Sequence, residues 1–600
     1  MKRHRFAFAL IAIVATTIFL APLIKQEVFT LRDHLDYFQP LRWFTAQELR
    51  AGHLPLWNPY NASGEPWLAN PQTNVFYPPA WIFLLLPFAT AYMLFLLFHL
   101  IVLGWGAYLL FARRAAPGAA MFGAVALMLS GPVLSLLDVN NNLAAFAWIP
   151  LVLWCAAEHA PMRGGFALAL VFVAGEPFLA GVAALLYVCV SRKARDIAVA
   201  ALIAFGISAI QLLPFLEMLA GSDRAAGLSE DIILRDSMPL GDWLRIVAWH
   251  PKLGQQFIPI IYVGAIVVAL AALGIRKRSI GWLALLIIVI IVASGPSFLA
   301  HLPLTLFRYP ARLVPFAALA IAALATVGWH RVRSGVRRRQ SPLSLSEEER
   351  RLASPHSRRW LDLLLILVVV ADLLWRARPL LHSEPFRRDL VPYAKEIGAD
   401  SKFLRVGDID PARRAAWISG YLNLYDHRFD AFTAAPVTND RYLRFHRRVL
   451  QRPSPIVLDA LPAGYLVTSL ALPFERIARA QNVSVYRNPG ARAMAIVMTP
   501  HGITPARWEI GTSHARVIAD AAEDGVVVLA QQDAPPWRVA VDGKNAKKRR
   551  IFGLFLGVDV PKGHHQVVFR YRSRALFLGA AMTLVTLFAM QIFFFVKQRK

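Results

Sequence analysis

Two acidic residues, Asp33 and Asp36, follow the first long apolar stretch of the chain, in the segment LRDHLDYFQP. A carboxylate beside a membrane span is costly unless it is solvated, paired or used in chemistry. If the segment is helical, a spacing of three residues puts both acids on one face. A carboxylate placed there could accept the proton of a hydroxyl nucleophile. The simpler alternative is that the two acids only begin a solvated loop.

The residues that follow the two acids favour an ordered loop. The segment GHLPLWNPYNASGEPWLANPQTNVFYPP is rich in proline, glycine, asparagine and aromatic residues. These residue types are typical of turns and of structured, partly buried loops. We therefore expect residues 25–79 to form a structured loop rather than a floppy tether.

The composition indicates a membrane protein with several spans. The chain has 600 residues, of which 56% are hydrophobic and 17% charged, and its mean hydropathy is +0.46. The net charge of +27 comes largely from Lys and Arg beside apolar stretches, which is typical of cytoplasmic loops rather than of a nucleic-acid site. The two cysteines lie inside apolar stretches, so neither a disulfide framework nor a zinc site is expected.

The apolar stretches predict the topology. They fall near residues 6–24, 80–111, 119–137, 142–157, 165–174, 177–190, 196–219, 257–274, 280–296, 311–330, 359–375 and 574–596. With both termini in the cytoplasm, the basic clusters fall on alternate loops if residues 165–190 are two short segments broken at Gly175–Pro177. The prediction is a polytopic α-helical protein of the bacterial inner membrane, with an uncleaved N-terminal anchor, about 12 crossings and residues 25–79 outside.

Residues 376–573 are expected to form an extracytoplasmic, β-rich domain that is sandwich-like. Residues 483–488, 526–530, 537–541 and 565–572 have the β-branched and aromatic content of strands. The sequence VDGK at 541–544 carries an Asp-Gly turn signal. The predicted domains are therefore a membrane module over residues 1–375, the β-rich domain, and a C-terminal membrane helix over residues 574–600.

Several motifs resemble one known family. DHLDYFQP and the proline-rich segment after it resemble the first outer loop of the YfhO-type bacterial membrane proteins, which belong to the GT-C class of polytopic glycosyltransferases. AFAWIPLVLW, QLLPFLEMLAGSDR, FRYPARLVPF, VSVYRNPGARAMAIV and PPWRVAVDGK resemble further family segments in the same order. The resemblance covers nearly the whole chain. One departure is AGEPFLAG, in which Glu176 stands where the family leads us to expect histidine.

The resemblance implies a GT-C-like membrane glycosyltransferase. Such an enzyme moves a monosaccharide from a polyprenyl-phosphate donor to an envelope glycan, lipid or polymer on the outer face of the membrane. The family pattern places the catalytic base in the first outer loop, where Asp33 is the best match and Asp36 the second. A single displacement by the acceptor would invert the configuration at the anomeric carbon, so an inverting, hexosyltransferase-type reaction is expected.

Arginines near outward span ends are candidates for binding the donor phosphate. The leaving group is already anionic, so it needs cations more than an acid. Arg308 and Arg312 lie at the start of the apolar stretch 311–330. Their guanidinium groups could bind a phosphate through forked hydrogen bonds at the depth of the lipid headgroups. Arg224 is a weaker third candidate. The alternative for these arginines is snorkelling to lipid headgroups.

The sugar and acceptor contacts are predicted at four residues. Asn58 and Gln72 could bind sugar hydroxyls, although their amides could equally satisfy the loop backbone. Trp57 could stack on a sugar or lie in an interfacial aromatic belt. Glu176 completes the set.

Two further acids have several interpretations. Glu217 could orient the acceptor, help to position Asp33 or hold a metal ion, and we favour pairing with an arginine such as Arg224, or positioning, over a metal. Asp138, with the asparagines at 140–142, is interpreted as a simple outer turn.

No cofactor is expected, since no Walker loop, dinucleotide fingerprint or His-Glu-x-x-His motif is present, although a divalent cation stays open. One alternative function is a lipid or polysaccharide flippase or transporter, which predicts charges at mid-bilayer depth and related halves. Another is a non-catalytic envelope assembly protein, which would tolerate loss of Asp33. The sequence names neither the sugar nor the acceptor.

Overall fold

The computed structural model describes residues 2–253, 256–301, 308–338, 355–398, 401–406, 418, 420–431, 437–451 and 462–598. The chain folds into two compact units, and it passes between them several times. Unit 1 comprises Met1–His34, Leu86–Phe205 and Gly227–Phe386, and unit 2 comprises Leu35–Leu85, Gly206–Ala226 and Arg387–Lys600.

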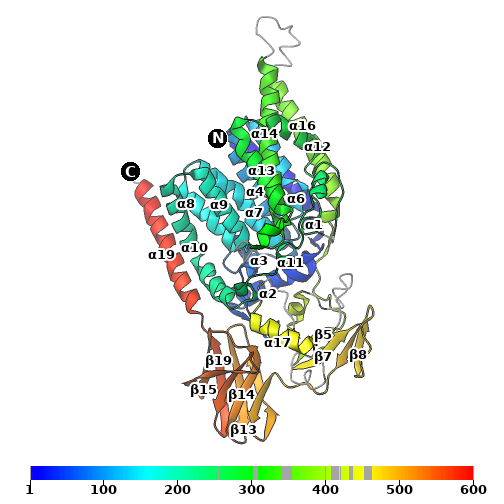
Figure 1. The fold of residues 1–600 in the computed structure, drawn as a ribbon, viewed down its shortest axis with the longest axis vertical. Coiled ribbons are helices and arrows are strands. Elements are labelled where there is room, and N and C mark those ends of the chain that lie inside the picture. The colour runs from blue at the N-terminus through cyan, green and yellow to red at the C-terminus, as the bar shows by residue number, and fades with distance from the viewer. Residues whose placement is uncertain are drawn as a thin grey trace. The chain divides into compact units, whose positions relative to one another are not determined.

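Unit 1 is helical (Figure 1). Its helices are α1 (Lys2–Lys25), α4 (Phe88–Ala112), α5 (Pro117–Met128), α6 (Gly131–Leu134), α7 (Asn140–Ala157), α8 (Pro161–Val173), α9 (Pro177–Ser191), α11 (Glu230–Ile233), α12 (Ala265–Gly274), α13 (Ile280–Ala293), α14 (Val314–Arg338) and α16 (Pro355–Ala377). The helix α10 (Ala194–Ala220) contributes residues to both units. The short strands β1 (Glu27–Phe29) and β4 (Ser383–Pro385) pair in antiparallel orientation. Each apolar stretch of the sequence therefore contains a helix here or in unit 2.

Five helical segments of the described chain are long and apolar enough to cross a membrane: His4–Lys25, Phe88–Ala112, Ala194–Ala220, Pro310–Ser334 and Arg574–Val596. Other apolar helices are shorter. With 13 residues in α8 and 15 in α9, each falls below the roughly 20 residues that a span needs. The predicted break between them is confirmed, since α8 ends at Val173, Gly175 has a positive φ and α9 begins at Pro177. The number of crossings stays a prediction.

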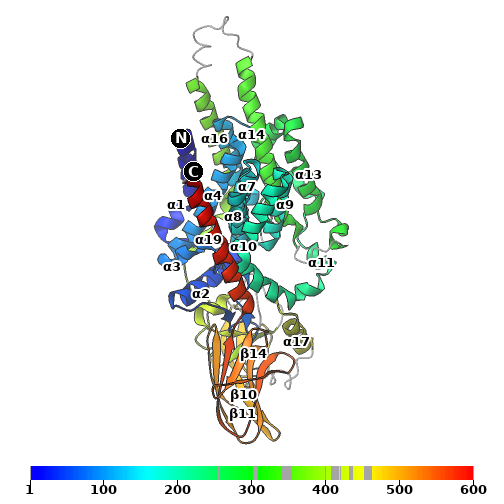
Figure 2. The ribbon, with the colours of Figure 1, turned by 90° about the vertical axis from the view of Figure 1, so that its left-hand side faces the viewer.

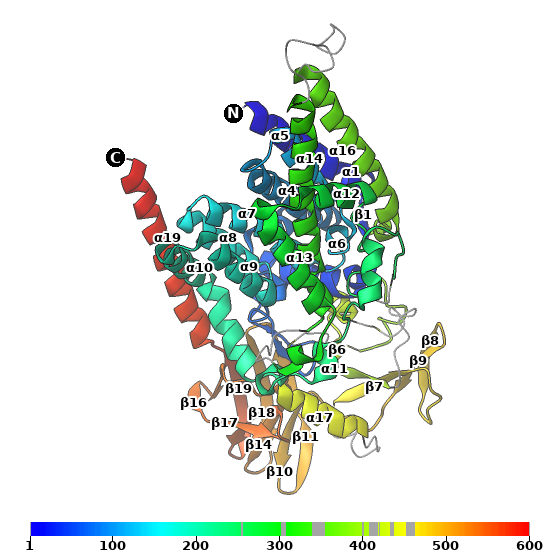
Figure 3. The same cartoon turned by 45° about the horizontal axis from the view of Figure 1, so that its top comes forward.

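Two glycines bring α12 and α14 into close contact, and α12 runs beside α14 in Figure 3. A Cβ atom on Gly274 would lie 1.9 Å from the carbonyl oxygen of Leu324, and one on Gly328 would lie 1.9 Å from that of Leu270. Small residues let two helix backbones approach this closely. This packing fixes α14, which is preceded by the 3₁₀ turn that carries Arg312.

Unit 2 contains the first loop and a mixed β-sheet. The loop includes α2 (Gln39–Arg50), the strand pair β2 (Trp57–Asn58) and β3 (Glu65–Pro66), and α3 (Ile82–Leu85). Most of its residues are buried, so the prediction of a structured loop is confirmed. The mixed sheet has the order β6-β5-β7-β9-β8, and β5 runs parallel to both of its neighbours. Its strands are β5 (Lys402–Val406), β6 (Phe429–Asp430), β7 (Ala463–Thr468), β8 (Arg476–Ala480) and β9 (Val483–Arg487).

Two further five-stranded sheets of unit 2 form a sandwich. One has the order β11-β10-β14-β18-β17, and its strands β10, β11 and β14 are labelled in Figure 2. The other has the order β12-β13-β19-β15-β16. The strands are β10 (Ala495–Thr499), β11 (Gly502–Pro505), β12 (Arg507–Ile510), β13 (His514–Ala521), β14 (Gly525–Gln532), β15 (Trp537–Val541), β16 (Lys544–Ala546), β17 (Lys548–Ile551), β18 (Phe555–Val560) and β19 (Gly563–Tyr571). All four predicted strands are present, as β9, β14, β15 and β19. Asp542 and Gly543 have the positive φ angles that a two-residue hairpin turn needs.

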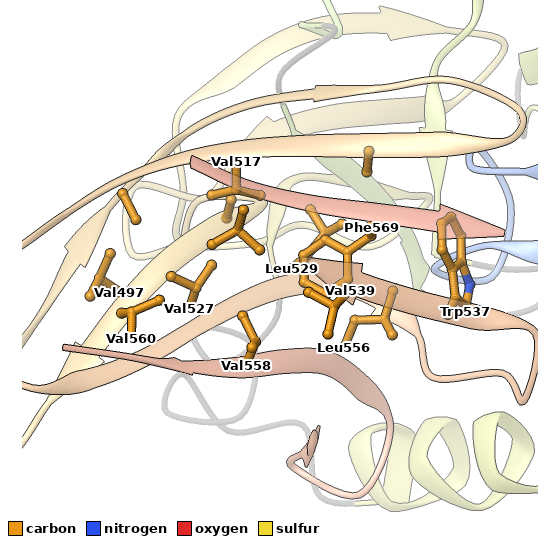
Figure 4. Close-up of a cluster of buried hydrophobic side chains, with 14 of the residues drawn as sticks. Val497, Val517, Val527, Leu529, Trp537, Val539, Leu556, Val558, Val560 and Phe569 are labelled. Carbon is orange, nitrogen blue, oxygen red and sulfur yellow. The ribbon is translucent and has the colours of Figure 1, made fainter. Parts of the chain in front are cut away.

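The sandwich has an aliphatic core. Val517, Val539 and Phe569 of one sheet and Val527 and Leu556 of the other lie between the two sheets (Figure 4) and are buried. These side chains alternate with exposed ones along their strands, most regularly in β13, as expected for sheets with one buried face.

Two helices complete unit 2. The helix α19 (Arg574–Gln598) follows β19 and packs along the second half of α10. Its Thr583 hydroxyl donates to the carbonyl of Gly206 at 2.9 Å and accepts from the amide of Ile210 at 3.1 Å. The helix α17 (Asp440–Gln451) packs Tyr442 and neighbouring apolar side chains against the mixed sheet.

Candidate active site

Unit 1 holds a buried ion pair just before the N-terminus of α7. The Nε atom of Arg32 lies 3.1 Å from an Oδ atom of Asp138, whose side chain is 3% exposed. Arg32 also donates through Nη1 to the carbonyls of Gln256, at 3.0 Å, and Phe257, at 3.4 Å. The Arg32 side chain therefore ties the chain after α1 to α7 and to the loop before α12.

A second buried ion pair lies close by. Arg312 Nη1 lies 3.3 Å from an Oε atom of Glu176, with side-chain exposures of 10% and 3%. The other Oε atom of Glu176 accepts from Asn142 Nδ2 at 3.0 Å. The Arg312 guanidinium also lies 5.2 Å from the ring centroid of Phe257. Since the carbonyl of Phe257 accepts from Arg32, the two ion pairs adjoin within unit 1.

The residue after Asp33 is fixed by a third set of contacts. His34 is fully buried, and its Nδ1 lies 2.7 Å from the hydroxyl of Tyr92. The Tyr92 hydroxyl donates to Asn140 at 2.8 Å, so the Nδ1 of His34 donates to Tyr92. Burial, helped by the nearby charge of Arg32, lowers the pKa of His34 to about 3. His34 is therefore a neutral, structural imidazole at neutral pH.

Asp33 lies between these two anchored residues. Its neighbours Arg32 and His34 are held by Asp138 and Tyr92, while its own side chain is only partly buried. The backbone at Asp33 is thus held on both sides by anchored neighbours, and the residue as a whole is partly exposed. A set backbone position is one of the features that a general base needs.

Arg308 adds a second positive charge beside Arg312. Its guanidinium lies 4.7 Å from the ring centroid of Tyr309, and that ring lies 5.3 Å from the guanidinium of Arg312. The Tyr309 ring also stacks on Phe257, with centroids 5.7 Å apart. Unit 1 therefore brings together four of the predicted residues: Asp33, Glu176, Arg308 and Arg312.

The remaining predicted residues belong to unit 2. Asp36 is 5% exposed and lies in the π-helical turn His34–Phe38, and its backbone carbonyl accepts from the amide of Tyr421 at 2.6 Å. The Asn58 amide donates to side-chain oxygens of Asn61 and Glu65, each at 3.0 Å. Both predicted residues thus contribute to the internal order of unit 2.

Gln72 and Trp57 also have partners inside unit 2. The Oε1 atom of Gln72 accepts from the Tyr37 hydroxyl at 2.7 Å. Trp57 is fully buried in the sandwich core, and its Nε1 donates to Gln531 at 2.9 Å. The Trp57 ring therefore packs in the sandwich core, and it also forms part of a cavity wall in unit 2.

Glu217 and Arg224 lie at the end of α10 and in the turn after it. Glu217 accepts a hydrogen bond from the Ser573 hydroxyl at 2.9 Å. Arg224 is 4% exposed, and its backbone amide donates to the Ser222 hydroxyl at 3.2 Å. In the described part of the chain, no group of three or more His, Cys, Asp or Glu residues could hold a metal ion.

Several residues of the unit 1 cluster are not predicted from the sequence. Arg32 is not among the candidate residues, and the sequence interpretation of Asp138 with its neighbouring asparagines is an outer turn. That interpretation is wrong, because Asp138 and the asparagines at 140–142 are buried and the asparagines begin α7. Three consecutive asparagines at the start of an apolar helix are the sequence feature that could have indicated a buried polar cluster here.

Residues 469–583 match the model of the family described as "Bacterial membrane protein YfhO". The matched segment begins directly after β7 and ends in the first part of α19. No curated protein matches the sequence at a significant level.

The fold is similar to that of a solved glycosyltransferase. The cryo-EM structure of the arabinofuranosyltransferase AftD from Mycobacteria matches 94% of this chain at 13% sequence identity, with a TM-score of 0.50. Two structures of a mutant of AftD match 94% and 95% of the chain at 12% and 11% identity, with TM-scores of 0.48 and 0.47. The chain spans 57%, 60% and 59% of the three matched chains. The first match confirms the expected architecture, a membrane-type helical protein with a C-terminal β-rich region.

Proposed function

We propose that the protein is a glycosyltransferase of the bacterial inner membrane. It takes a monosaccharide from a polyprenyl-phosphate donor and transfers it to an envelope glycan, lipid or polymer on the outer face. The fold similarity to an arabinofuranosyltransferase and the match to a bacterial membrane protein family support this proposal. The observation that carries it is the fixed position of Asp33, between Arg32 and His34, next to a buried arginine site.

In the proposed reaction Asp33 is the base. Its carboxylate accepts the proton of an acceptor hydroxyl while that oxygen attacks the anomeric carbon of the donor. The bond between the anomeric carbon and the phosphate oxygen breaks, and polyprenyl phosphate leaves as an anion. One displacement inverts the anomeric centre. Asp36 is the second candidate for the base.

Arg308 and Arg312 are proposed to bind the donor phosphate. Two guanidinium groups can form charge-assisted hydrogen bonds to phosphate oxygens and stabilise the charge that develops on the leaving group. Glu176 was expected to contact the sugar, but its two oxygens are bonded to Arg312 and Asn142. We therefore give Glu176 a different role, that of a positioning residue that holds Arg312.

Unit 2 has a cavity of its own, of about 460 Å³, which we propose as a binding site for a glycan-like ligand. Its lining includes Trp57, Glu65, Glu217, Arg444 and Asp533. Acids, arginines and aromatic groups around one cavity suit a polar, hydroxyl-rich ligand. Asn58 and Arg224 contact this lining through Glu65 and Ser222, whereas the partner of Gln72, Tyr37, lies outside it.

A transporter of a lipid-linked sugar is the second candidate, because buried ion pairs inside an apolar helical unit are also found along transport pathways. One experiment separates the two functions. Purified protein is incubated with the lipid extract of a deletion strain and an envelope acceptor fraction, and the lipids are followed by mass spectrometry. A transferase converts the lipid-linked sugar to polyprenyl phosphate only when the acceptor is present. A transporter or an assembly protein leaves the masses unchanged, and that result would refute the proposal.

A further inference from the structure

Unit 1 has a cavity of about 580 Å³ at the far ends of the helices that carry the candidate active site. The helix α7 shows the relationship most clearly, because it begins at Asn140 beside the ion pairs and ends at Ala157 in the cavity wall. At a rise of 1.5 Å per residue, these two residues are roughly 25 Å apart along the helix. Likewise, Tyr92 lies near the start of α4 and Glu176 directly precedes α9, and both helices line the cavity at their other ends. The cavity is therefore separate from the site described above.

Arginines surround this cavity. Its described lining includes Arg113, Arg114, Arg192 and Arg278 and no carboxylate. Arg113 pairs outside the lining with Glu158, at 2.5 Å. Arg114 Nη1 donates to the backbone carbonyl of Arg278 at 3.3 Å, which brings the ends of α4 and the start of α13 together. Four guanidinium groups line the cavity and only one of them is paired with a carboxylate among the residues that the structure describes, so the cavity edge that they form is strongly positive.

The walls of the cavity are apolar. They are formed by Leu110, Phe111, Leu153, Leu186 and Leu285, with Trp282 at the half-buried edge. An apolar wall below a rim of arginines requires an occupant with a hydrocarbon part and an anionic part. The indole of Trp282 fits the level of the headgroups, where tryptophan is enriched.

We propose that this cavity binds an anionic phospholipid, with an acyl chain against the apolar wall and the phosphate on the arginines. Basic pockets between membrane helices are suited to such headgroups, and arginine binds phosphate with forked hydrogen bonds. The basic clusters on these helix ends are those that the positive-inside rule assigns to the cytoplasmic side. The occupant is therefore a phospholipid of the cytoplasmic leaflet. This site does not depend on the proposed transferase activity.

The test uses the full-length protein purified in a neutral detergent, with lipid binding followed by native mass spectrometry and thermal unfolding. Three proteins are compared: the wild type, the double variant Arg192→Gln/Arg278→Gln, and the matched control Lys193→Gln/Lys277→Gln. The control removes the same charge at the adjacent positions, which do not line the cavity. The probes are phosphatidylglycerol, phosphatidylcholine, glycerol phosphate and polyprenyl phosphate.

We expect phosphatidylglycerol to bind the wild type and the control and to raise their Tm, while the arginine variant needs a concentration about tenfold higher or more. Phosphatidylcholine and glycerol phosphate should have no comparable effect. The proposal is overturned if the lysine control loses as much binding, if phosphatidylcholine binds equally well, if glycerol phosphate displaces the lipid, or if polyprenyl phosphate is preferred. If the arginine variant does not fold, competition among the four probes on the wild type still decides.

Discussion

Glu176 and Arg312 lie 136 residues apart in the chain, and their side chains form an ion pair of 3.3 Å in the interior of unit 1. Removing one partner of a buried pair leaves the other charge uncompensated, which typically costs about 3–5 kcal/mol. We therefore expect Glu176→Gln to lower the free energy of unfolding by this amount. The double variant Glu176→Gln/Arg312→Gln should be less destabilised than the sum of the two single variants. Denaturant unfolding in micelles measures both effects.

The exposed pair of Arg113 and Glu158 is the matched control for this prediction. Their side chains are 30% and 43% exposed, and a pair of this kind contributes about 1 kcal/mol or less. If Glu176→Gln is no more destabilising than Glu158→Gln, the interior pair does not have the structural role that we assign to it.

Asp138 is expected to act on the reaction through Arg32. Replacing it in Asp138→Asn weakens the anchor on one side of Asp33, and a small displacement of a catalytic group can lower the rate by about 100-fold. We expect kcat to fall roughly 10- to 100-fold, while KM changes little because Asp138 does not contact the substrate. Initial rates with purified protein test this.

The control for this prediction is Asp196→Asn, which removes a carboxylate that contacts the partly exposed His159 at 2.9 Å. A purely structural role for Asp138 would instead reduce the amount of folded protein and leave kcat per folded molecule unchanged.

Lys402 makes the stability of unit 2 depend on pH in the alkaline range. Its amino group is buried and donates to the Ser63 hydroxyl at 2.6 Å and the Ala530 carbonyl at 2.8 Å. Burial lowers the pKa of Lys402 from 10.5 to about 7. Between these values the unfolded chain binds the proton and the folded chain does not. The free energy of unfolding should therefore rise with pH across this window, by up to about 1.4 kcal/mol per pH unit.

Thermal or denaturant unfolding from pH 7 to pH 10 measures this slope. Lys402→Met should remove it, whereas the same change at the exposed Lys544 should leave it in place. An equal slope in wild type and Lys402→Met would show that other groups cause the pH dependence.

Gly328 allows the close contact between α12 and α14, and a larger residue should separate the two helices. The Cβ of an alanine would lie 1.9 Å from the carbonyl oxygen of Leu270. Overpacking of this kind costs about 1–3 kcal/mol, so Gly328→Ala should lower the Tm. At Gly281 in α13 an added Cβ meets nothing within 4 Å, and Gly281→Ala should be neutral or stabilising, since alanine favours a helix. Equal Tm values for the two variants would contradict the packing that we describe.

The sequence predicted where helices and strands occur better than it predicted which of them pack or pair with one another. Apolar stretches marked the helices, and β-branched segments marked β9, β14, β15 and β19, because these signals are local. The sheet order β13-β19-β15 joins strands that are distant in the chain, and no local pattern encodes such pairing. The strand β8, with the sequence RIARA, was missed because two arginines in five residues conceal its strand character.

The same limit applies to the candidate site. Asp33 could be named among several candidate acids because an acid beside an apolar stretch is unusual, whereas its choice over Asp36 rests on the family resemblance. Arg32 could not be distinguished from the many arginines that flank spans until the structure placed it against Asp138. Glu176 and Arg312 were each selected, but for different roles, since a sequence does not show that two residues meet across 136 positions.

We propose Asp33, held between Arg32 and His34, as the base of a lipid-dependent sugar transfer. The most direct measurement is lipid and glycan mass spectrometry on a deletion strain that carries wild type, Asp33→Asn or Asp36→Asn at equal membrane levels. We predict that Asp33→Asn accumulates the same lipid-linked sugar, and loses the same envelope sugar, as the empty deletion strain, while Asp36→Asn retains transfer. Normal envelope sugar in Asp33→Asn would contradict the account, most clearly if Asp36→Asn had lost it.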